Sequence, residues 1–300
     1  SGNLTIAGES TFITRADGSD IELGSSGNAF ADGVTMQAET DGSEAFGNIT
    51  FVDSGAVNFN SSGSTDGDLF IDGSTDGAVG GNLSITATTG DITQGIALAV
   101  TGTSSFTTSR INDDITLGSV NVFTGGVTLN TSGSTGHAVV DNGTTALIIA
   151  ASSVGGDLTL TSGAADGIID SGNVTVTGNL IATTDANSGV IDMGTLRVDG
   201  TMALTTDGDG NATVVNDTLL DFANSTVRGN LVATATTGNI IDTGVLTISG
   251  TSTFTTSQSN DDITLGSVNV LTGAVALNTS GSTGHAVVDN GTTALIIAAS

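Results

Sequence analysis

Residues 106–150 read FTTSRINDDITLGSVNVFTGGVTLNTSGSTGHAVVDNGTTALIIA, and residues 254–298 read FTTSQSNDDITLGSVNVLTGAVALNTSGSTGHAVVDNGTTALIIA. The two stretches lie 148 residues apart and differ at only a handful of positions. A diverged third copy starts at about residue 8, where GESTFITRADGSDIELG aligns with GTSSFTTSRINDDITLG from Gly102. Self-similarity over such distances indicates a repeat architecture, in which each unit stacks on its neighbour. A single active site has no use for near-identical copies, so the pattern favours a structural protein over an enzyme.

A shorter repeat runs inside the long one. Gly81 starts GNLSITATTGDITQGIALAVTG, and Gly229 starts GNLVATATTGNIIDTGVLTISG. Similar starts recur along the whole chain at intervals of roughly 21–31 residues, which gives about twelve turns. Within a turn the apolar residues alternate, as Leu83 and Ile85 do, and a period of two indicates strands with one buried face.

The composition supports strands and tight turns. The chain has 44 Gly and no Pro, Cys, Trp or Tyr, while Thr, Ser, Val, Ile, Asn and Asp dominate. Pro is harmful wherever each backbone N–H must join a ladder, so its absence fits a chain that is nearly all sheet. No stretch shows the apolar spacing of a helix. We therefore predict an all-β parallel β-helix (β-solenoid) with three strands per turn. Residues 1–300 are expected to form one continuous solenoid, as a window of a longer repetitive chain.

The composite pattern GNLxIxAxTGxIxxxGxLxVxG, drawn from turns such as those that start at Gly81 and Gly229, resembles the repeat regions of filamentous-haemagglutinin-like adhesins and other giant bacterial surface proteins. The resemblance covers essentially the whole chain and lies in the composition and the repeat pattern rather than in a specific motif. It implies a right-handed β-helix, secretion across an outer membrane, and a role in adhesion or as an extracellular filament.

The charge is strongly acidic, with 31 Asp and Glu against four Arg and a net charge of −27. Such a balance argues against nucleic acid and anionic membranes as partners. No apolar run is long enough to span a bilayer, so no membrane insertion is expected. The expected partners are neighbouring repeats or subunits of the same filament, a surface polysaccharide, or a host or prey cell surface.

Two groups of acidic residues are candidate calcium ligands. Asp207, Asp209 and Asn211 have the D-x-D-x-N spacing of a calcium loop, although position twelve is Thr218 rather than Glu. The alternative is that they are ordinary turn residues. No cofactor is expected apart from this ion.

The second group follows the apolar pairs of IIDSG and VIDMG, which places Asp170 and Asp192 at the same point of successive turns. Stacked carboxylates about 5 Å apart repel unless water or a cation lies between them. The alternative is that each carboxylate caps a turn by accepting backbone N–H groups.

Catalytic signals are weak. Residues 112–114 (NDD) and their copy 260–262 resemble paired carboxylates of glycoside hydrolases, but adjacent strand residues point to opposite faces. His137 and His285 occupy the same position in the two copies and have no second His or Cys nearby. We expect a polar corner and a loop histidine, and no catalytic residues.

The sequence thus predicts a structural and adhesive segment of a secreted cell-surface or extracellular filament. The alternative is an extracellular β-helix that binds or degrades polysaccharide, which the absence of Trp and Tyr for sugar stacking disfavours.

Overall fold

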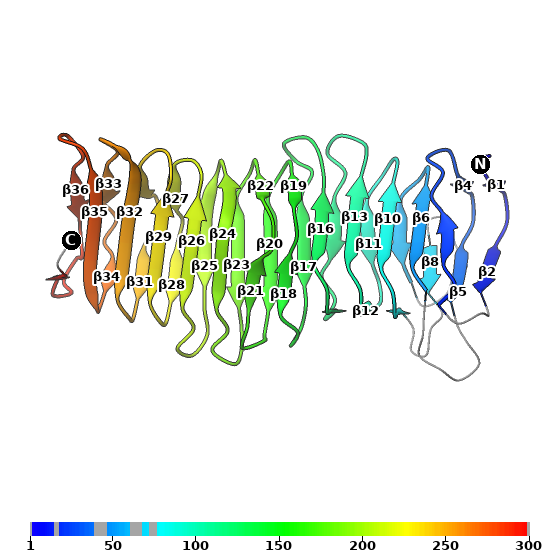
Figure 1. The fold of residues 1–300 in the computed structure, drawn as a ribbon, viewed down its shortest axis with the longest axis horizontal. Coiled ribbons are helices and arrows are strands. Elements are labelled where there is room, and N and C mark those ends of the chain that lie inside the picture. The colour runs from blue at the N-terminus through cyan, green and yellow to red at the C-terminus, as the bar shows by residue number, and fades with distance from the viewer. Residues whose placement is uncertain (1, 15–17, 39–46, 61–67, 72–76, 299–300) are drawn as a thin grey trace. The chain divides into compact units, whose positions relative to one another are not determined.

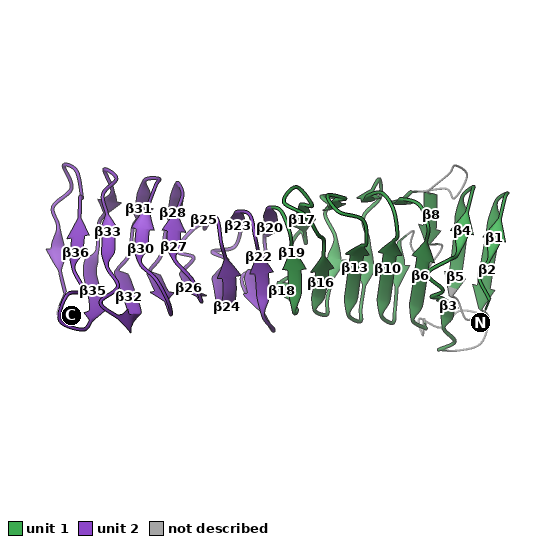
Figure 2. Cartoon of the chain, turned by 90° about the horizontal axis from the view of Figure 1, so that it is seen from above, with its two compact units in different colours: residues 1–156 green, residues 157–300 purple. Residues whose placement is uncertain are grey.

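The protein is all-β in the computed structural model, which describes residues 2–14, 18–38, 47–60, 68–71 and 77–298. These residues contain no helix, so none of them forms a helix that could cross a membrane. The chain divides into two compact units, Ser1–Gly156 and Asp157–Ser300, each a stack of coils with parallel strands (Figures 1 and 2). The stacks hold about twelve coils in all, which confirms the predicted parallel β-solenoid.

The first unit contains two large sheets. The first sheet runs through β3 (Ile21–Leu23), β6 (Ile49–Asp53), β10 (Leu83–Ala87), β13 (Ser104–Thr108) and β16 (Val127–Asn130), and β16 also pairs with β18 (Leu147–Ile149) and β19 (Ser152–Val154). The second sheet runs through β2 (Ser10–Thr14), β5 (Val34–Ala38), β8 (Asp68–Ile71), β7 (Val57–Phe59), β11 (Ile92–Gln94), β14 (Ile115–Leu117) and β17 (Ala138–Asp141).

Two smaller sheets complete the described strands of the first unit. One runs through β9 (Ala78–Val79), β12 (Ala99–Val100) and β15 (Val122–Phe123), and the other pairs β1 (Thr5–Ile6) with β4 (Ala29–Phe30). A coil such as the one that begins at β10 therefore has three strands, one in each of three sheets, as the sequence predicts.

The described strands of the second unit form two sheets. The first runs through β24 (Ile191–Val198), β26 (Ala212–Asn216), β29 (Leu231–Ala235), β32 (Ser252–Ser259), β35 (Ala274–Ser280) and β37 (Ile296–Ile297), and β21 (Ile168–Asp170) and β22 (Val174–Val176) both pair with β24. The second runs through β20 (Leu158–Ser162), β23 (Leu180–Thr184) and β25 (Thr201–Thr205), then β27 (Leu220–Phe222), β28 (Ser225–Val227), β30 (Ile240–Asp242), β31 (Leu246–Ile248), β33 (Ile263–Leu265), β34 (Val270–Leu271) and β36 (Ala286–Val288). Two short strands of one coil can thus lie in the same sheet.

The core follows from the alternation in sequence. In β10, Leu83, Ile85 and Ala87 point inward and are at most 1% exposed, while the residues between them lie at the surface. Ile85 is opposite Phe51 and Phe106 on the neighbouring strands, so like residues form columns. Burial of each large side chain contributes about 1.5–3 kcal/mol. The columns therefore supply most of the stability of a coil.

The coils vary in length more than the repeat spacing predicts. Ala212 pairs with Leu231, which lies 19 residues further along the chain, whereas Ile49 pairs with Leu83, 34 residues further. The longer coil contains β8, which pairs with both β5 and β7. Strand positions are fixed by pairing and corners are not, so inserted residues are accommodated between strands.

The leucines of the GNL and GDL repeat starts do not stack in a single column. Leu158 is opposite Leu180 in the second sheet of its unit, but Leu231 lies in the first sheet, opposite Ala212 and Ser252. All three leucines are at most 1% exposed, which agrees with the alternation of apolar residues within each turn. The spacing between starts is sometimes longer than one coil, so a later start falls on the other sheet.

Candidate functional site

Polar side chains at the corners bond one coil to the next. Asn48 Oδ1 accepts the backbone N–H of Asn82 at 2.8 Å, and Asn82 Oδ1 accepts that of Thr103 at 2.8 Å. In the second unit Asn230 Oδ1 accepts the N–H of Thr251 at 2.8 Å. In each case the earlier coil supplies the oxygen and the later coil the donor. These bonds satisfy backbone N–H groups at corners where strand pairing stops.

The glycines before these asparagines and before the threonines that bond to them allow the corners to approach closely. Gly102 N donates to Gly81 O at 3.0 Å, and a Cβ at Gly102 would lie 2.5 Å from that oxygen. Gly250 has the same relation to Gly229, with a nitrogen-to-oxygen distance of 2.9 Å. The repeated Gly-Asn of the sequence is therefore a stacking device in which Gly gives the space and Asn gives the bond.

A second set of asparagines is buried in the core. Asn142 is fully buried, and its Oδ1 accepts the N–H of Phe123 at 2.7 Å while its Nδ2 donates to the carbonyl of Phe123 at 3.0 Å. Asn216 bonds in the same way to both backbone groups of Val198. The side-chain amide thus takes the place of a strand. Sequence reasoning missed these residues, and the signal that could have found them is an Asn at the end of an apolar strand or just after it.

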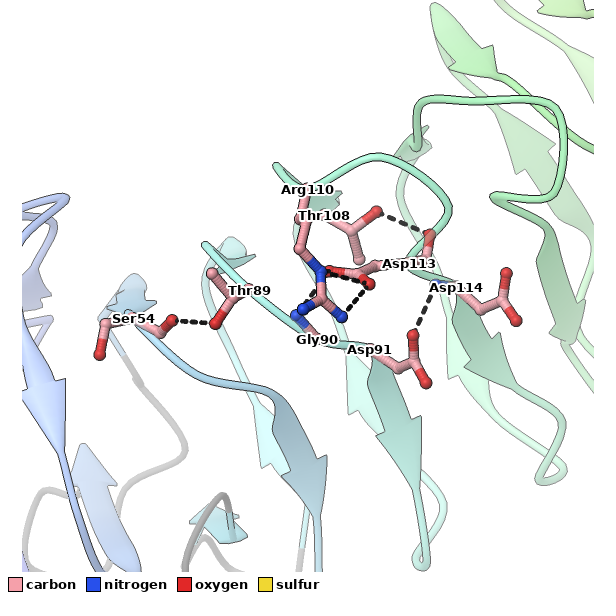
Figure 3. Close-up of polar contacts among 8 residues, drawn as sticks. All are labelled: Ser54, Thr89, Gly90, Asp91, Thr108, Arg110, Asp113 and Asp114. Atoms are coloured by element: carbon pink, nitrogen blue, oxygen red, sulfur yellow. Dashed lines mark hydrogen bonds and ion pairs between the residues drawn. The ribbon is translucent and has the colours of Figure 1, made fainter.

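Arg110 and Asp113 form a closely spaced ion pair at one corner (Figure 3). Arg110 Nη2 lies 2.8 Å from Asp113 Oδ1, and Nε donates to both carboxylate oxygens at 3.0 and 3.1 Å. The backbone N–H of Gly90 on the preceding coil also donates to Asp113. The Asp113 side chain is only 4% exposed. Its charge is therefore held by an arginine fork and a backbone donor, as a buried charge requires.

The pair affects the titration of the arginine. The hydrogen bond from Arg110 to Asp113, and then the attraction between the two charges, raise the pKa of Arg110 above its ordinary value. The guanidinium is therefore charged at every physiological pH, and this corner is a fixed structural ion pair rather than an acid–base centre.

The duplicated corner differs at the arginine. Gln258 stands at the position of Arg110, and Asp261 at that of Asp113. Oδ2 of Asp261 is buried and has no hydrogen-bond partner among the described residues. The second copy therefore carries a carboxylate without the cation that the first copy supplies.

The neighbouring acids and histidines are also structural. Asp114 Oδ1 accepts the backbone N–H of His137 at 2.7 Å, and Asp262 accepts that of His285 at 2.8 Å. The His285 ring lies 3.6 Å from the same Asp262 carboxylate and is largely exposed. Both acids therefore serve as corner caps, in agreement with the polar corner and loop histidine expected from the sequence.

The proposed calcium loop at Asp207, Asp209 and Asn211 is a tight turn. Its backbone closes through Gly210 N and Asp207 O at 2.9 Å, and Asp209 N donates to Ser188 Oγ at 3.2 Å. Asn211 Oδ1 accepts the N–H of Asn230 at 2.7 Å, so that oxygen already belongs to a corner ladder.

The predicted stacking of Asp170 on Asp192 is wrong. Asp192 is opposite Ile169, one residue out of register with Asp170. Asp170 instead accepts the N–H groups of Gly194 and Thr195 at 2.9 and 2.6 Å, which is the capping alternative. Parallel strands fix the register residue by residue, and the sequence spacing between the two acids misses the register by one.

The acidic and histidine side chains do not gather into a metal-ligand cluster in the part of the chain that the structure describes. Within those residues no group of three or more His, Cys, Asp or Glu is placed to hold a metal ion. Calcium binding at Asp207, Asp209, Asn211, Asp170 and Asp192 stays a prediction.

Stacked parallel coils with ladders of Asn and Gly at their corners define a β-solenoid repeat protein. The chain belongs to the family described as Repeats of unknown function (DUF5649), whose profile matches residues 1–37, 46–130 and 209–278. No curated protein and no solved structure matches the chain. These findings do not tie it to filamentous haemagglutinin.

Proposed function

We propose that the chain is a structural and adhesive segment of a secreted bacterial cell-surface or extracellular filament, and that it works as a passive repetitive scaffold. The observation that supports this proposal is the use of the polar side chains. Asn48, Asn82, Asn142 and Asn216 direct their oxygens to the backbone of a neighbouring coil. Such groups hold a stack together and leave little reactive chemistry on it, so the proposal includes no catalytic activity.

The proposed location is extracellular or at the cell surface. The acidic, Thr- and Ser-rich composition and the resemblance to giant bacterial surface repeats support it, and the same resemblance suggests a right-handed coil. The proposed partners are neighbouring repeats or subunits of the filament, surface polysaccharide, or a host or prey cell surface. The net charge of −27 opposes binding to nucleic acid and anionic membranes.

The test is a deletion of one long repeat, residues 106–253, from the full-length protein. The remaining copy at residues 254–298 then follows Ser105 in the frame that residues 106–150 had. A stack in which coils contact only their neighbours should close over this deletion. We expect the filament to shorten by about 29 Å per chain in electron micrographs, for about six coils at 4.8 Å each, with secretion and attachment kept. Loss of a hydrolytic or lyase activity on polysaccharide in the deleted protein would refute the scaffold function.

A further inference from the structure

The strand β24 carries a bulge next to an arginine. Its register against β26 shifts between Met193 and Leu196, so Gly194 and Thr195 together face one residue of the partner strand. Asp170 fixes the bulge, because its carboxylate accepts both backbone N–H groups and also the Thr195 hydroxyl at 2.7 Å. Bulges of this kind redirect side chains and commonly lie beside binding sites.

A hollow of about 220 Å³ lies at the bulge, entirely within the second unit. Its apolar lining residues include Val174, Leu196 and Val215, of which Val174 and Leu196 are buried. Its polar lining consists of Asn173, Thr175, Thr195, Arg197, Asp217 and Thr236.

Donors and acceptors alternate along this lining. Thr175 is directly opposite Arg197 on the neighbouring strand. Leu196 is opposite Asn216, and Asn216 is opposite Ala235, so Asp217 follows Arg197 in the same outward column. Successive coils therefore present a hydroxyl, a guanidinium and a carboxylate to the hollow.

The guanidinium has donors to spare. Arg197 Nε lies 3.4 Å from Asp199 Oδ1, and the Arg197 side chain is 53% exposed. An arginine has five N–H donors in a planar fork, and this contact uses one nitrogen. The remaining donors and the exposed Asp217 carboxylate can meet two hydroxyl groups of one ligand.

The geometry points to a binding site for one sugar residue of an uncharged polysaccharide. Sugar hydroxyls both donate and accept, which matches a lining that holds Arg197 beside Asp217. An anion would meet the field of a chain with net charge −27 and the nearby Asp170, Asp199 and Asp217. A volume of about 220 Å³ is below the range of 300–1,000 Å³ for drug-sized ligands, so it suits a single ring. This inference rests on the part of the proposed function that names surface polysaccharide as a partner, whereas the scaffold itself needs no ligand.

The test uses ¹⁵N-labelled protein and four probes: glucose, galactose, mannose and N-acetylglucosamine, each titrated to about 100 mM. We expect at least one of them to shift the Arg197 Nε resonance and the amide resonances of Thr175 and Thr195. In Arg197→Gln the affinity should fall about tenfold or more, because a hydrogen bond to a charged group is lost. Arg228→Gln is the matched control, since Arg228 belongs to the same unit and does not line the hollow.

Each other outcome overturns the site. No shift with any of the four sugars excludes a saccharide site, and equal losses in Arg197→Gln and Arg228→Gln indicate non-specific binding. A parallel titration with sodium sulfate separates sugar from anion: a response to sulfate alone would mean an anion site. The amide spectrum far from the hollow confirms that Arg197→Gln is folded. Because the readout is a resonance shift, the result does not depend on whether the chain acts as a scaffold.

Discussion

Asn142 bonds to Phe123 as a neighbouring strand would, since one side-chain amide pairs with both the N–H and the carbonyl of that residue. Its Nδ2 also donates to the carbonyls of Thr145 and Ala146, so the same side chain closes its own corner. Asn290 repeats this arrangement on Leu271 in the other copy. At this position a buried side-chain amide, rather than a strand, therefore pairs with the backbone of the neighbouring coil.

Replacing that amide should destabilise the coil. Asn142→Ala leaves two buried backbone groups of Phe123 without partners, and each costs about 1–3 kcal/mol. We expect a loss of about 2–5 kcal/mol, measured as local hydrogen-exchange protection of Phe123 and its neighbours. Asn173→Ala, at an exposed position, is the control and should change stability by no more than about 0.5 kcal/mol. Equal effects of the two variants would contradict the role assigned to Asn142.

The glycine corners give a prediction with a close control. Gly102→Ala places a methyl group 2.5 Å from Gly81 O, and backbone must move to relieve the contact. We expect a cost of about 1–3 kcal/mol, seen as a lower denaturant midpoint. Gly118→Ala meets nothing within 4 Å, so its effect should be near zero or slightly stabilising. If Gly102→Ala leaves the denaturant midpoint unchanged, the backbones of the two coils do not approach closely at this corner.

The fold could be predicted from sequence because alternation and repetition report directly on the buried columns. Leu83 and Ile85 are both buried, because residues two apart in a strand lie on the same face. The register between coils could not be predicted, because it depends on corner lengths that the pattern leaves free. For this reason the sequence places Asp170 on Asp192, although the strands pair Asp192 with Ile169. The partner of a polar side chain, such as Phe123 for Asn142, depends on the same register.

The inward register of β23 can be tested with adjacent residues. Leu180→Asp puts an unpaired charge at a fully buried position and should cost about 3 kcal/mol or more, unfolding several coils. Ile181 is 41% exposed on the same strand, so Ile181→Asp should have a small effect. Thermal melting by circular dichroism measures both. An unchanged melting temperature for Leu180→Asp is incompatible with the register described above.

The two copies of the acidic corner make a reciprocal pair of variants. Arg110→Gln should lower the melting temperature, because it leaves Asp113 buried without its cation. Gln258→Arg should raise it by giving Asp261 a partner. Thermal melting of both variants beside the unsubstituted protein measures these shifts. Changes of the opposite sign would show that the ion pair does not stabilise the corner.

The same ion pair gives a prediction about pH. The pKa of Arg110 is raised in the folded protein, so its contribution to stability is complete below the ordinary arginine pKa. That contribution is lost only as the pH rises through the raised value. The difference in melting temperature between the unsubstituted protein and the Arg110→Gln variant should therefore be the same at pH 7 and pH 9. A difference that disappears at pH 9 would contradict the assignment.

Calcium is expected to stabilise the protein modestly. This expectation rests on the high density of carboxylates, with Asp207 and Asp209 in one turn. Free calcium at ten times its Kd would add about 1.4 kcal/mol. The measurement is thermal melting in calcium and then in chelator at fixed ionic strength, with Asp207→Asn as the comparison. Identical curves in the two conditions would leave these acids as turn residues only.

The corner ladders also give the stack a direction. In the bonds from Asn48 to Asn82 and from Asn82 to Thr103, the oxygen belongs to the earlier coil and the N–H to the later one. At these corners a block of coils therefore has accepting oxygens at one end and donating N–H groups at the other, and a block cut at equivalent corners of this kind can stack on another. Unequal recombination between tandem gene segments joins blocks head to tail in this same sense. Such an event preserves the interface chemistry at the new junction, so chain length can change in evolution without a compensating mutation.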